Sequence, residues 1–265
     1  QPKNNLKIVS EKKNARMLLP NMLTLIGVCI GLTSIRFALD GKFEFAIIAI
    51  IFAALIDGLD GRIARLIKGT SKVGKELDSL TDMISFGVAP AFIMYFWKLN
   101  TLGRFGWLIC LVYVICVALR LARFNVNSNQ DPSWRDNFFE GVPSPAGGIL
   151  VLTPLIISLS GFDYIQLNYE IITPIFFIVT SFLLISKFPS YSFKKIVIQR
   201  KATIFLLFGI VLFFGLLLIY TFEVIAISSM IYLSLLPISF FHYQNIKKNN
   251  ENDKIQDDED LEDEL

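Results

Sequence analysis

The chain alternates between long apolar runs and short polar, charged segments. Eight of these runs are long enough, or nearly so, to cross a bilayer, which takes about 20 helical residues. We therefore expect an all-α polytopic membrane protein with about eight transmembrane helices. Two of the runs are short and leave a count of six or seven open. The runs lie near residues 20–39, 43–67, 75–98, 104–124, 145–160, 170–187, 203–219 and 222–242.

Basic residues divide unequally between alternate connecting segments. With a cytoplasmic N-terminus and eight spans, the cytoplasmic segments hold 21 of the 25 lysines and arginines. The outer loops hold only Lys42, Lys98 and Arg104, and Arg36 lies in the first run, from which its long side chain can reach the outer interface. Cytoplasmic loops of membrane proteins are enriched in Lys and Arg. We therefore expect both termini in the cytoplasm and a location in a bacterial cytoplasmic membrane.

The composition is typical of a membrane protein and excludes an ordinary soluble domain. Hydrophobic residues make up 54% of the chain, and its mean hydropathy is +0.56. Cys29, Cys110 and Cys116 all lie in apolar runs and lack the spacing of metal ligands, so we expect small core residues. The first apolar run is long and has no clear small-residue cleavage site, which predicts a retained helix rather than a signal peptide.

The two ends of the chain are polar and opposite in charge. Residues 1–18 predict a basic cytoplasmic leader, and residues 244–265 predict an acidic, disordered cytoplasmic tail. One transmembrane domain accounts for residues 19–243. Because the acidic residues gather in the tail, the rest of the chain is strongly cationic and suits anionic lipids. We expect no nucleic-acid partner.

Four aspartates lie where the second and third apolar runs meet. Asp57 and Asp60 are three residues apart near the end of the second run, so a helix places both on one face. Asp78 and Asp82 are four residues apart near the start of the third. A short polar turn joins the two helices, so they are expected to be antiparallel neighbours with both acidic pairs at the same depth. The sequence therefore predicts a site between them at the cytoplasmic boundary.

Such a cluster predicts bound metal ions. Four facing carboxylates cannot all stay ionised without cations, and an all-oxygen set favours Mg²⁺, Mn²⁺ or Ca²⁺ over zinc or copper. A single aspartate here could merely cap a helix or pair with Arg62 or Arg65. Four in register, at membrane depth and beside small residues, favour a functional site. An EF-hand is excluded because the segment continues as helix.

The acids and the small residues around them fit a longer pattern, D-G-x2-A-R-x8-G-x3-D-x3-D, with every fixed position filled. A motif of this length is far more specific than a lone glycine-rich loop. By this pattern, with a further acid upstream at Asp57, the chain resembles the CDP-alcohol phosphotransferases. The matching positions are Asp60, Gly61, Ala64, Arg65, Gly74, Asp78 and Asp82.

Within that family the chain is most similar to the membrane-embedded phosphatidylserine synthases, over roughly residues 18–150. The resemblance implies transfer of the phosphatidyl group from CDP-diacylglycerol to the hydroxyl of L-serine, giving phosphatidylserine and CMP. It also implies two divalent ions, Mg²⁺ or Mn²⁺ with Ca²⁺ as a further occupant, and a homodimer. The segments that carry it are PNMLTL at 20–25, GKELDSLTDMISFGVAPA at 74–91, LRLARFN at 119–125 and EGVPSPAGG at 140–148.

The resemblance implies a role for each site residue. Asp57, Asp60 and Asp78 would be metal ligands, and Asp82 would border the metals and act as general base for the serine hydroxyl. The zwitterionic acceptor needs a cation for its carboxylate, and Arg120 and Arg123 are candidates with Asn125 nearby, although either arginine could be a positive-inside anchor. Contacts to CDP-diacylglycerol would come from Asn21, Thr24, Gly61, Ala64, Arg65, Ser71 and Gly74.

The segment 140–148 joins the fourth and fifth runs. Pro143 and Pro145 are expected to fix this turn, while Gly147 and Gly148 would permit close helix packing. We prefer this packing role to a direct part in catalysis.

Three other functions were weighed. A family member with another acceptor, such as a phosphatidylglycerophosphate or phosphatidylinositol-phosphate synthase, shares the acidic motif. A cation transporter could also use intramembrane acids, but it would place them nearer the bilayer midplane, without arginines suited to phosphates. The phospholipase D type of serine transferase needs paired His-Lys motifs, and His242 is the only histidine. That mechanism is excluded.

Overall fold

The computed structural model of the chain describes residues 4–66, 72–127, 138–161, 167–186, 189–191 and 200–239. A helix forms at each of the eight apolar runs, which confirms the expected helical fold class. Length and composition allow four of the described helices to cross a membrane, and the eight-span topology stays a prediction. These four are Pro20–Leu39, Val73–Trp97, Arg104–Val126 and Thr221–Ser239.

The chain divides into two compact units, and each is described by itself. The first comprises residues 1–130 and 143–185, and the second comprises residues 131–142 and 186–265. The expectation of one domain over residues 19–243 stays a prediction.

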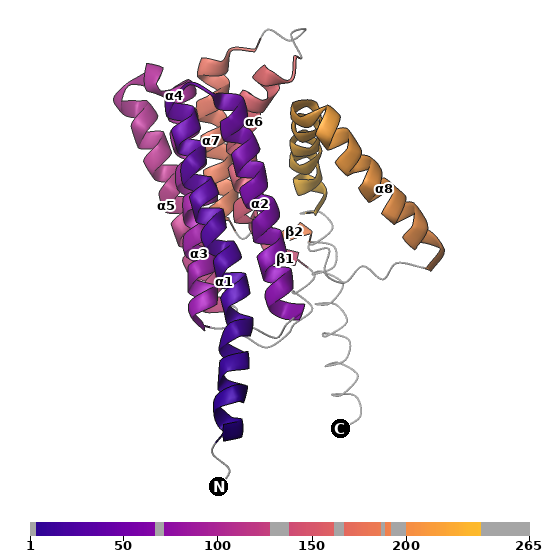
Figure 1. The fold of residues 1–265 in the computed structure, drawn as a ribbon. Coiled ribbons are helices and arrows are strands. Elements are labelled where there is room, and N and C mark those ends of the chain that lie inside the picture. Colours follow the sequence, from indigo (N-terminus) through magenta and orange to yellow (C-terminus); the bar gives the residue numbers. More distant parts are fainter. Residues whose placement is uncertain are drawn as a thin grey trace, which may run out of the picture. The chain divides into compact units, whose positions relative to one another are not determined.

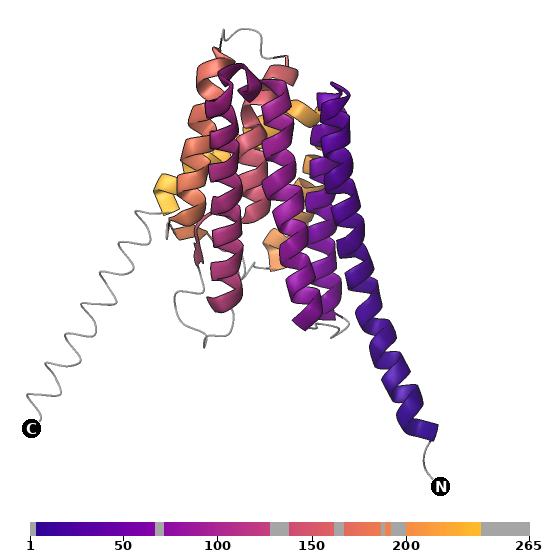
Figure 2. The same cartoon turned by 90° about the vertical axis from the view of Figure 1, so that its left-hand side faces the viewer.

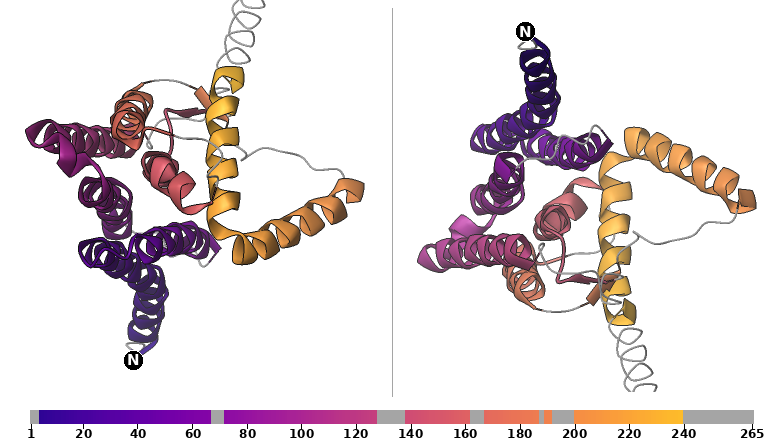
Figure 3. Two further views of the ribbon diagram at one scale, coloured as in Figure 1. Left: turned by 90° about the horizontal axis from the view of Figure 1, so that it is seen from above. Right: turned by 90° about the horizontal axis from the view of Figure 1, so that it is seen from below.

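The helices of the first unit run side by side, as Figures 1 and 2 show, and appear end-on in Figure 3. The first helix packs against the second, third and fourth, and the fifth and sixth pack against the seventh. The elements are α1 (Asn4–Leu39), α2 (Phe43–Leu66), α3 (Lys72–Asp82), the π-helix η1 (Met83–Val88), α4 (Ala89–Trp97), the 3₁₀-helix η2 (Leu99–Leu102), α5 (Arg104–Asn127), α6 (Ser144–Leu159) and α7 (Tyr169–Ile185).

The second unit contains two helices and a small sheet. Its helices are α8 (Arg200–Ile219) and Thr221–Ser239. The strands β1 (Phe138–Glu140) and β2 (Pro189–Tyr191) pair antiparallel, with Phe139 opposite Ser190. The sequence analysis did not predict this strand pair.

Helix α1 begins at Asn4, well before the expected apolar boundary, so most of the basic leader is helical. Pro20 lies inside the helix. Proline costs a helix one backbone hydrogen bond but is tolerated where neighbouring helices support the chain.

Small residues let the helices of the first unit approach closely. A side chain added at Gly31 of α1 would lie 2.5 Å from Ser85 Oγ and 3.1 Å from Ser85 Cα. One added at Gly148 of α6 would lie 3.2 Å from Phe86 Cα, and one at Gly147 would lie 3.0 Å from Leu184 Cδ2. The predicted packing role of Gly147 and Gly148 is therefore confirmed.

A π-helical turn, η1, separates α3 from α4. Its backbone register is shown by Ala89 N–H, which donates to Ile84 O five residues earlier. Pro90 has no N–H to donate to Phe86 O in an α-helical register, and the Tyr113 hydroxyl donates to that oxygen instead, at 2.6 Å. Pi-helical turns are frequent at functional sites. This one follows Asp82 directly.

Candidate metal centre

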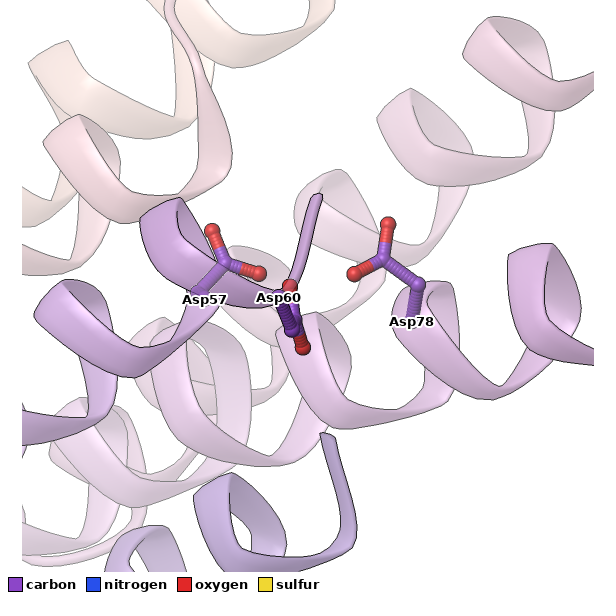
Figure 4. A group of neighbouring side chains, drawn as sticks. All are labelled: Asp57, Asp60 and Asp78. Atoms are coloured by element: carbon purple, nitrogen blue, oxygen red, sulfur yellow. The ribbon is translucent and has the colours of Figure 1, made fainter. Parts of the chain in front are cut away.

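The acidic residues of α2 and α3 meet in one cluster. Asp57, Asp60 and Asp78 each contribute a carboxylate oxygen to a group whose members lie within 4.8 Å of one another. Figure 4 shows the Asp57 and Asp78 carboxylates facing each other, with Asp60 between them. The predicted convergence of the two acidic pairs is therefore confirmed for three of the four aspartates.

Asp82, the last residue of α3, joins this cluster through Asp57. The two side chains are within hydrogen-bonding distance of each other. Two carboxyl groups this close need either a shared proton or a cation. The fourth predicted residue thus borders the other three.

Two buried carboxylate oxygens in the cluster have no hydrogen-bond partner among the described residues. Asp60 Oδ1 and Asp82 Oδ1 are buried and accept no hydrogen bond from the part of the chain that the structure describes. Buried polar atoms are nearly always satisfied, so each such atom calls for a partner from elsewhere. An oxygen-only donor set with free lone pairs is what Mg²⁺, Mn²⁺ and Ca²⁺ prefer. The residues present therefore fit a divalent cation.

Helix α1 supplies the partner for the other Asp60 oxygen. The Thr24 hydroxyl lies 2.7 Å from Asp60 Oδ2 and 2.9 Å from Pro20 O. Both Thr24 and Asp60 are buried. The same turn of α1 also contacts α3, because the Thr81 hydroxyl lies 3.4 Å from Thr24 O and 2.9 Å from Leu77 O.

A cation from α5 lies next to the acids. The charge of Arg120 acts on Asp82, and Arg120 Nη1 donates a hydrogen bond to Ser144 Oγ at the start of α6. Ser144 is fully buried. Ser144 was not among the predicted site residues, although it lies inside the EGVPSPAGG segment.

The other two residues predicted to bind the acceptor have other partners. Arg123 Nη1 donates to Ile185 O of α7 at 2.7 Å. Asn125 Nδ2 lies 3.0 Å from Ser79 Oγ and 3.5 Å from Glu76 Oε2 on α3. Of the three candidates on α5, Arg120 is the one whose charge acts on Asp82. Glu76 and Ser79, which are three residues apart on α3 and both contact Asn125, were also not predicted.

The remaining residues predicted to contact CDP-diacylglycerol lie on α1, α2 and α3 or outside the described residues. Asn21 is partly exposed on α1, one turn before Thr24, and Gly74 lies on α3 one turn before Asp78. A side chain added at Gly61 would meet nothing within 4 Å in the described residues, so this position has room for a ligand. Two predictions concern positions where no side chain is described: Ala64 and Arg65 in α2. Ser71 lies outside the described residues.

The part of the chain that holds the cluster matches a known protein family. Residues 17–183 match the family model described as CDP-alcohol phosphatidyltransferase. This range contains all four aspartates, Arg120 and Ser144.

Relatives from several bacteria are named CDP-diacylglycerol–serine O-phosphatidyltransferase. The one from Mycobacterium leprae is 46% identical over 144 residues, which are 54% of this chain and 48% of the relative. The one from Helicobacter pylori strain 26695 is 35% identical over 201 residues, 76% of this chain and 83% of the relative. The one from Bacillus subtilis is 33% identical over 177 residues, which are 67% of this chain and 92% of the relative. The chain therefore spans about half the length of the mycobacterial relatives that it matches.

Proposed function

This chain belongs to the CDP-alcohol phosphatidyltransferase family, and from that premise we propose that it transfers the phosphatidyl group from CDP-diacylglycerol to L-serine. The products are phosphatidylserine and CMP. The observation that carries the proposal is the oxygen-only cluster of Asp57, Asp60 and Asp78, whose carboxylates lie within 4.8 Å of one another. The printed names of the relatives support serine as the acceptor.

Asp57, Asp60 and Asp78 would hold two divalent ions, with Asp82 at the border of the site. We propose Mg²⁺ or Mn²⁺, with Ca²⁺ as a further occupant. When bound, such ions neutralise a pyrophosphate and stabilise the leaving nucleotide in phosphoryl-transfer sites. The buried Asp60 Oδ1 and Asp82 Oδ1, which have no protein partner among the described residues, support this assignment.

The nucleotide of CDP-diacylglycerol would lie against the open side of α2. Gly61 leaves space there, since no described atom lies within 4 Å of its hypothetical side chain. Arg65 would pair with a phosphate oxygen, because its planar guanidinium matches phosphate geometry. The full proposed set is Asn21, Thr24, Gly61, Ala64, Arg65, Ser71 and Gly74.

Asp82 would act as the general base. It accepts the proton of the serine hydroxyl while the hydroxyl oxygen attacks the phosphorus that bears diacylglycerol. The new bond joins serine oxygen to phosphorus, and the bond from phosphorus to the CMP oxygen breaks. Arg120, whose charge acts on Asp82, also suits the carboxylate of serine. Arg123 and Asn125 are the weaker candidates for serine contacts.

The proposed enzyme is an integral protein of a bacterial cytoplasmic membrane with eight spans. Its active site and both termini would face the cytoplasm, where the basic residues gather. We further propose that it works as a homodimer.

Acceptor specificity is the test of this function. Purified protein is supplied with CDP-diacylglycerol and Mn²⁺ or Mg²⁺, and with radiolabelled serine, glycerol 3-phosphate or inositol phosphate in separate reactions. Labelled phosphatidylserine with serine alone is the expected result. A labelled product from either of the other acceptors instead would assign the chain to another branch of the family.

The transporter alternative is tested in the same preparation. Metal-dependent release of CMP in detergent, without any membrane gradient, is expected of the transferase. A transporter would release none.

A further inference from the structure

We infer that Thr24 is a positioning residue for the metal centre: its hydroxyl holds Asp60 Oδ2 and thereby leaves Asp60 Oδ1 available to the cation. The inference rests on the proposed function, because it assumes that the acidic cluster binds divalent ions. It adds a role toward the metal to the proposed contact of Thr24 with the CDP group.

The two oxygens of Asp60 differ sharply in their surroundings. Oδ2 lies 2.7 Å from the Thr24 hydroxyl, whereas Oδ1 is buried and has no partner in the described part of the chain. A hydrogen bond to a carboxylate is shorter and stronger than one to a neutral acceptor, and low local dielectric strengthens it further. Thr24 has a single hydroxyl proton, and its hydrogen bond to Asp60 is therefore favoured over one to Pro20 O, which lies 2.9 Å away. That bond, together with the backbone hydrogen bond from Gly61 to the same carboxylate, fixes the rotation of the carboxylate.

Thr24 is also held in place by the helix that carries the other acids. The Thr81 hydroxyl lies 3.4 Å from Thr24 O, and a side chain added at Gly27 would lie 3.2 Å from Thr81 Cγ2. Thr81 is buried and immediately precedes Asp82. Thr24 therefore contacts both acidic helices. Its hydroxyl bonds to Asp60 on α2, and its carbonyl oxygen lies against Thr81 on α3, the helix that carries Asp78 and Asp82.

Residues that orient metal ligands without touching the metal have a characteristic effect. Their loss typically lowers metal affinity or activity by about 10- to 100-fold. Thr24→Val keeps the shape of the side chain and removes the hydroxyl, so we expect Mn²⁺ affinity to fall by about that factor. Thr24→Ser keeps the hydroxyl and is expected to bind Mn²⁺ within a few-fold of the wild type.

Thr33→Val is the matched control. Thr33 lies on the same helix, and its hydroxyl also donates to the carbonyl oxygen four residues earlier, Cys29 O at 2.6 Å. Thr33 is exposed, and its hydroxyl bonds to a backbone carbonyl oxygen and not to a carboxylate. Thr33→Val therefore makes the same threonine-to-valine change on α1 without removing a hydrogen bond to a carboxylate, and Mn²⁺ affinity should stay at the wild-type value.

The experiment measures Mn²⁺ binding by electron paramagnetic resonance on the full chain in detergent, before any substrate is added. The KM for CDP-diacylglycerol at saturating Mn²⁺ is the second measurement. Weaker Mn²⁺ binding by Thr24→Val, with Thr24→Ser and Thr33→Val unchanged, supports the inference. Should the valine variant not fold, Thr24→Ala replaces it, because it also removes the hydroxyl and adds no branch.

Two results would overturn the inference, and they differ in what else they affect. If Thr24→Val binds Mn²⁺ as the wild type does but has a raised KM for CDP-diacylglycerol, Thr24 contacts the nucleotide, and the proposed function stands. If the wild type itself binds no Mn²⁺, the proposed metal centre fails together with the role of Thr24.

Discussion

The Tyr113 hydroxyl donates a hydrogen bond of 2.6 Å to Phe86 O, one turn beyond Asp82. Tyr113 is fully buried on α5, and Pro90 cannot serve that carbonyl oxygen in an α-helical register. The side chain therefore supports the backbone at the point where α3 passes into the π-helix η1. Since η1 follows the acidic helix directly, this contact helps to fix the end of the metal centre.

Tyr113→Phe is expected to lower the free energy of unfolding by about 1–3 kcal/mol, because it leaves a buried carbonyl oxygen without this donor. Thermal unfolding in detergent measures the effect. Tyr95→Phe is the control, since the ring contacts of Tyr95 with Phe96 and Trp107 survive the change. Equal melting temperatures for both variants would mean that the hydroxyl of Tyr113 contributes no stability.

Removal of divalent ions is expected to abolish activity. A chelator should stop product formation, and added Mn²⁺ or Mg²⁺ should restore it, because the acidic cluster has only carboxylate oxygens to offer a cation. Asp57→Asn, Asp60→Asn and Asp78→Asn should each weaken Mn²⁺ binding, measured by titration.

Asp40→Asn is the charge-matched control for these variants. Asp40 pairs with Arg36 at 3.3 Å beyond the end of α1 and lies outside the cluster. Mn²⁺ binding that falls as much in Asp40→Asn as in the cluster variants would show a general charge effect instead of specific ligation.

Asp82→Asn is expected to lower kcat by about 10²–10⁴-fold, the usual contribution of a positioned general base. Binding of CDP-diacylglycerol should remain largely intact, because the base acts on the acceptor hydroxyl. Rates of CMP release, combined with a direct binding assay, separate the two effects. A near-normal kcat would remove Asp82 from the role of base.

Arg120→Ala is expected to raise the KM for serine by roughly tenfold or more, since hydrogen bonds to charged groups contribute about 1.5–3 kcal/mol. Ser144→Ala should produce a smaller increase, because Ser144 holds the guanidinium and leaves its charge in place. Arg104→Ala, at the other end of α5, is the control. Arg123→Ala tests whether that residue binds serine. An unchanged KM for serine would show that Arg123 only anchors the helix.

Gly31→Ala is expected to lower the melting temperature and weaken Mn²⁺ binding. The new methyl group would lie 2.5 Å from Ser85 Oγ and 3.1 Å from Ser85 Cα, so α1 and the helix after Asp82 must separate. Overpacking of this kind costs about 1–3 kcal/mol. Gly209→Ala on α8 meets no described atom within 4 Å and serves as the control. Equal behaviour of the two variants would contradict close packing at Gly31.

The acidic centre could be predicted from the sequence because its geometry is mostly local. Asp57 and Asp60 share one helix face, Asp78 and Asp82 share another, and a short connection forces the two helices together. The helix starts could be placed only from apolar boundaries, so the early beginning of α1 at Asn4 was not anticipated.

Contacts between segments far apart in the chain could not be predicted from the sequence. The bonds of Thr24 to Asp60 and of Arg120 to Ser144 join residues 36 and 24 positions apart, and no periodicity reports on them. The placing of Asn125 beside Arg120 at the serine site stays a prediction. Five residues turn a helix by about 500°, or about 140° beyond a full turn, so the two side chains leave α5 in different directions.

The π-helical turn after Asp82 lets side chains before and after it face different neighbours. One additional residue within a turn shifts the orientation of all later side chains by about 100° relative to an uninterrupted α-helix. The first half of Val73–Trp97 can thus aim its acids at α2, while Phe86 and the residues beyond it are aimed independently at α1, α5 and α6. A deletion of one residue in this turn would rotate the acidic residues before it relative to the packing residues after it. Every side chain of the motif would still be present.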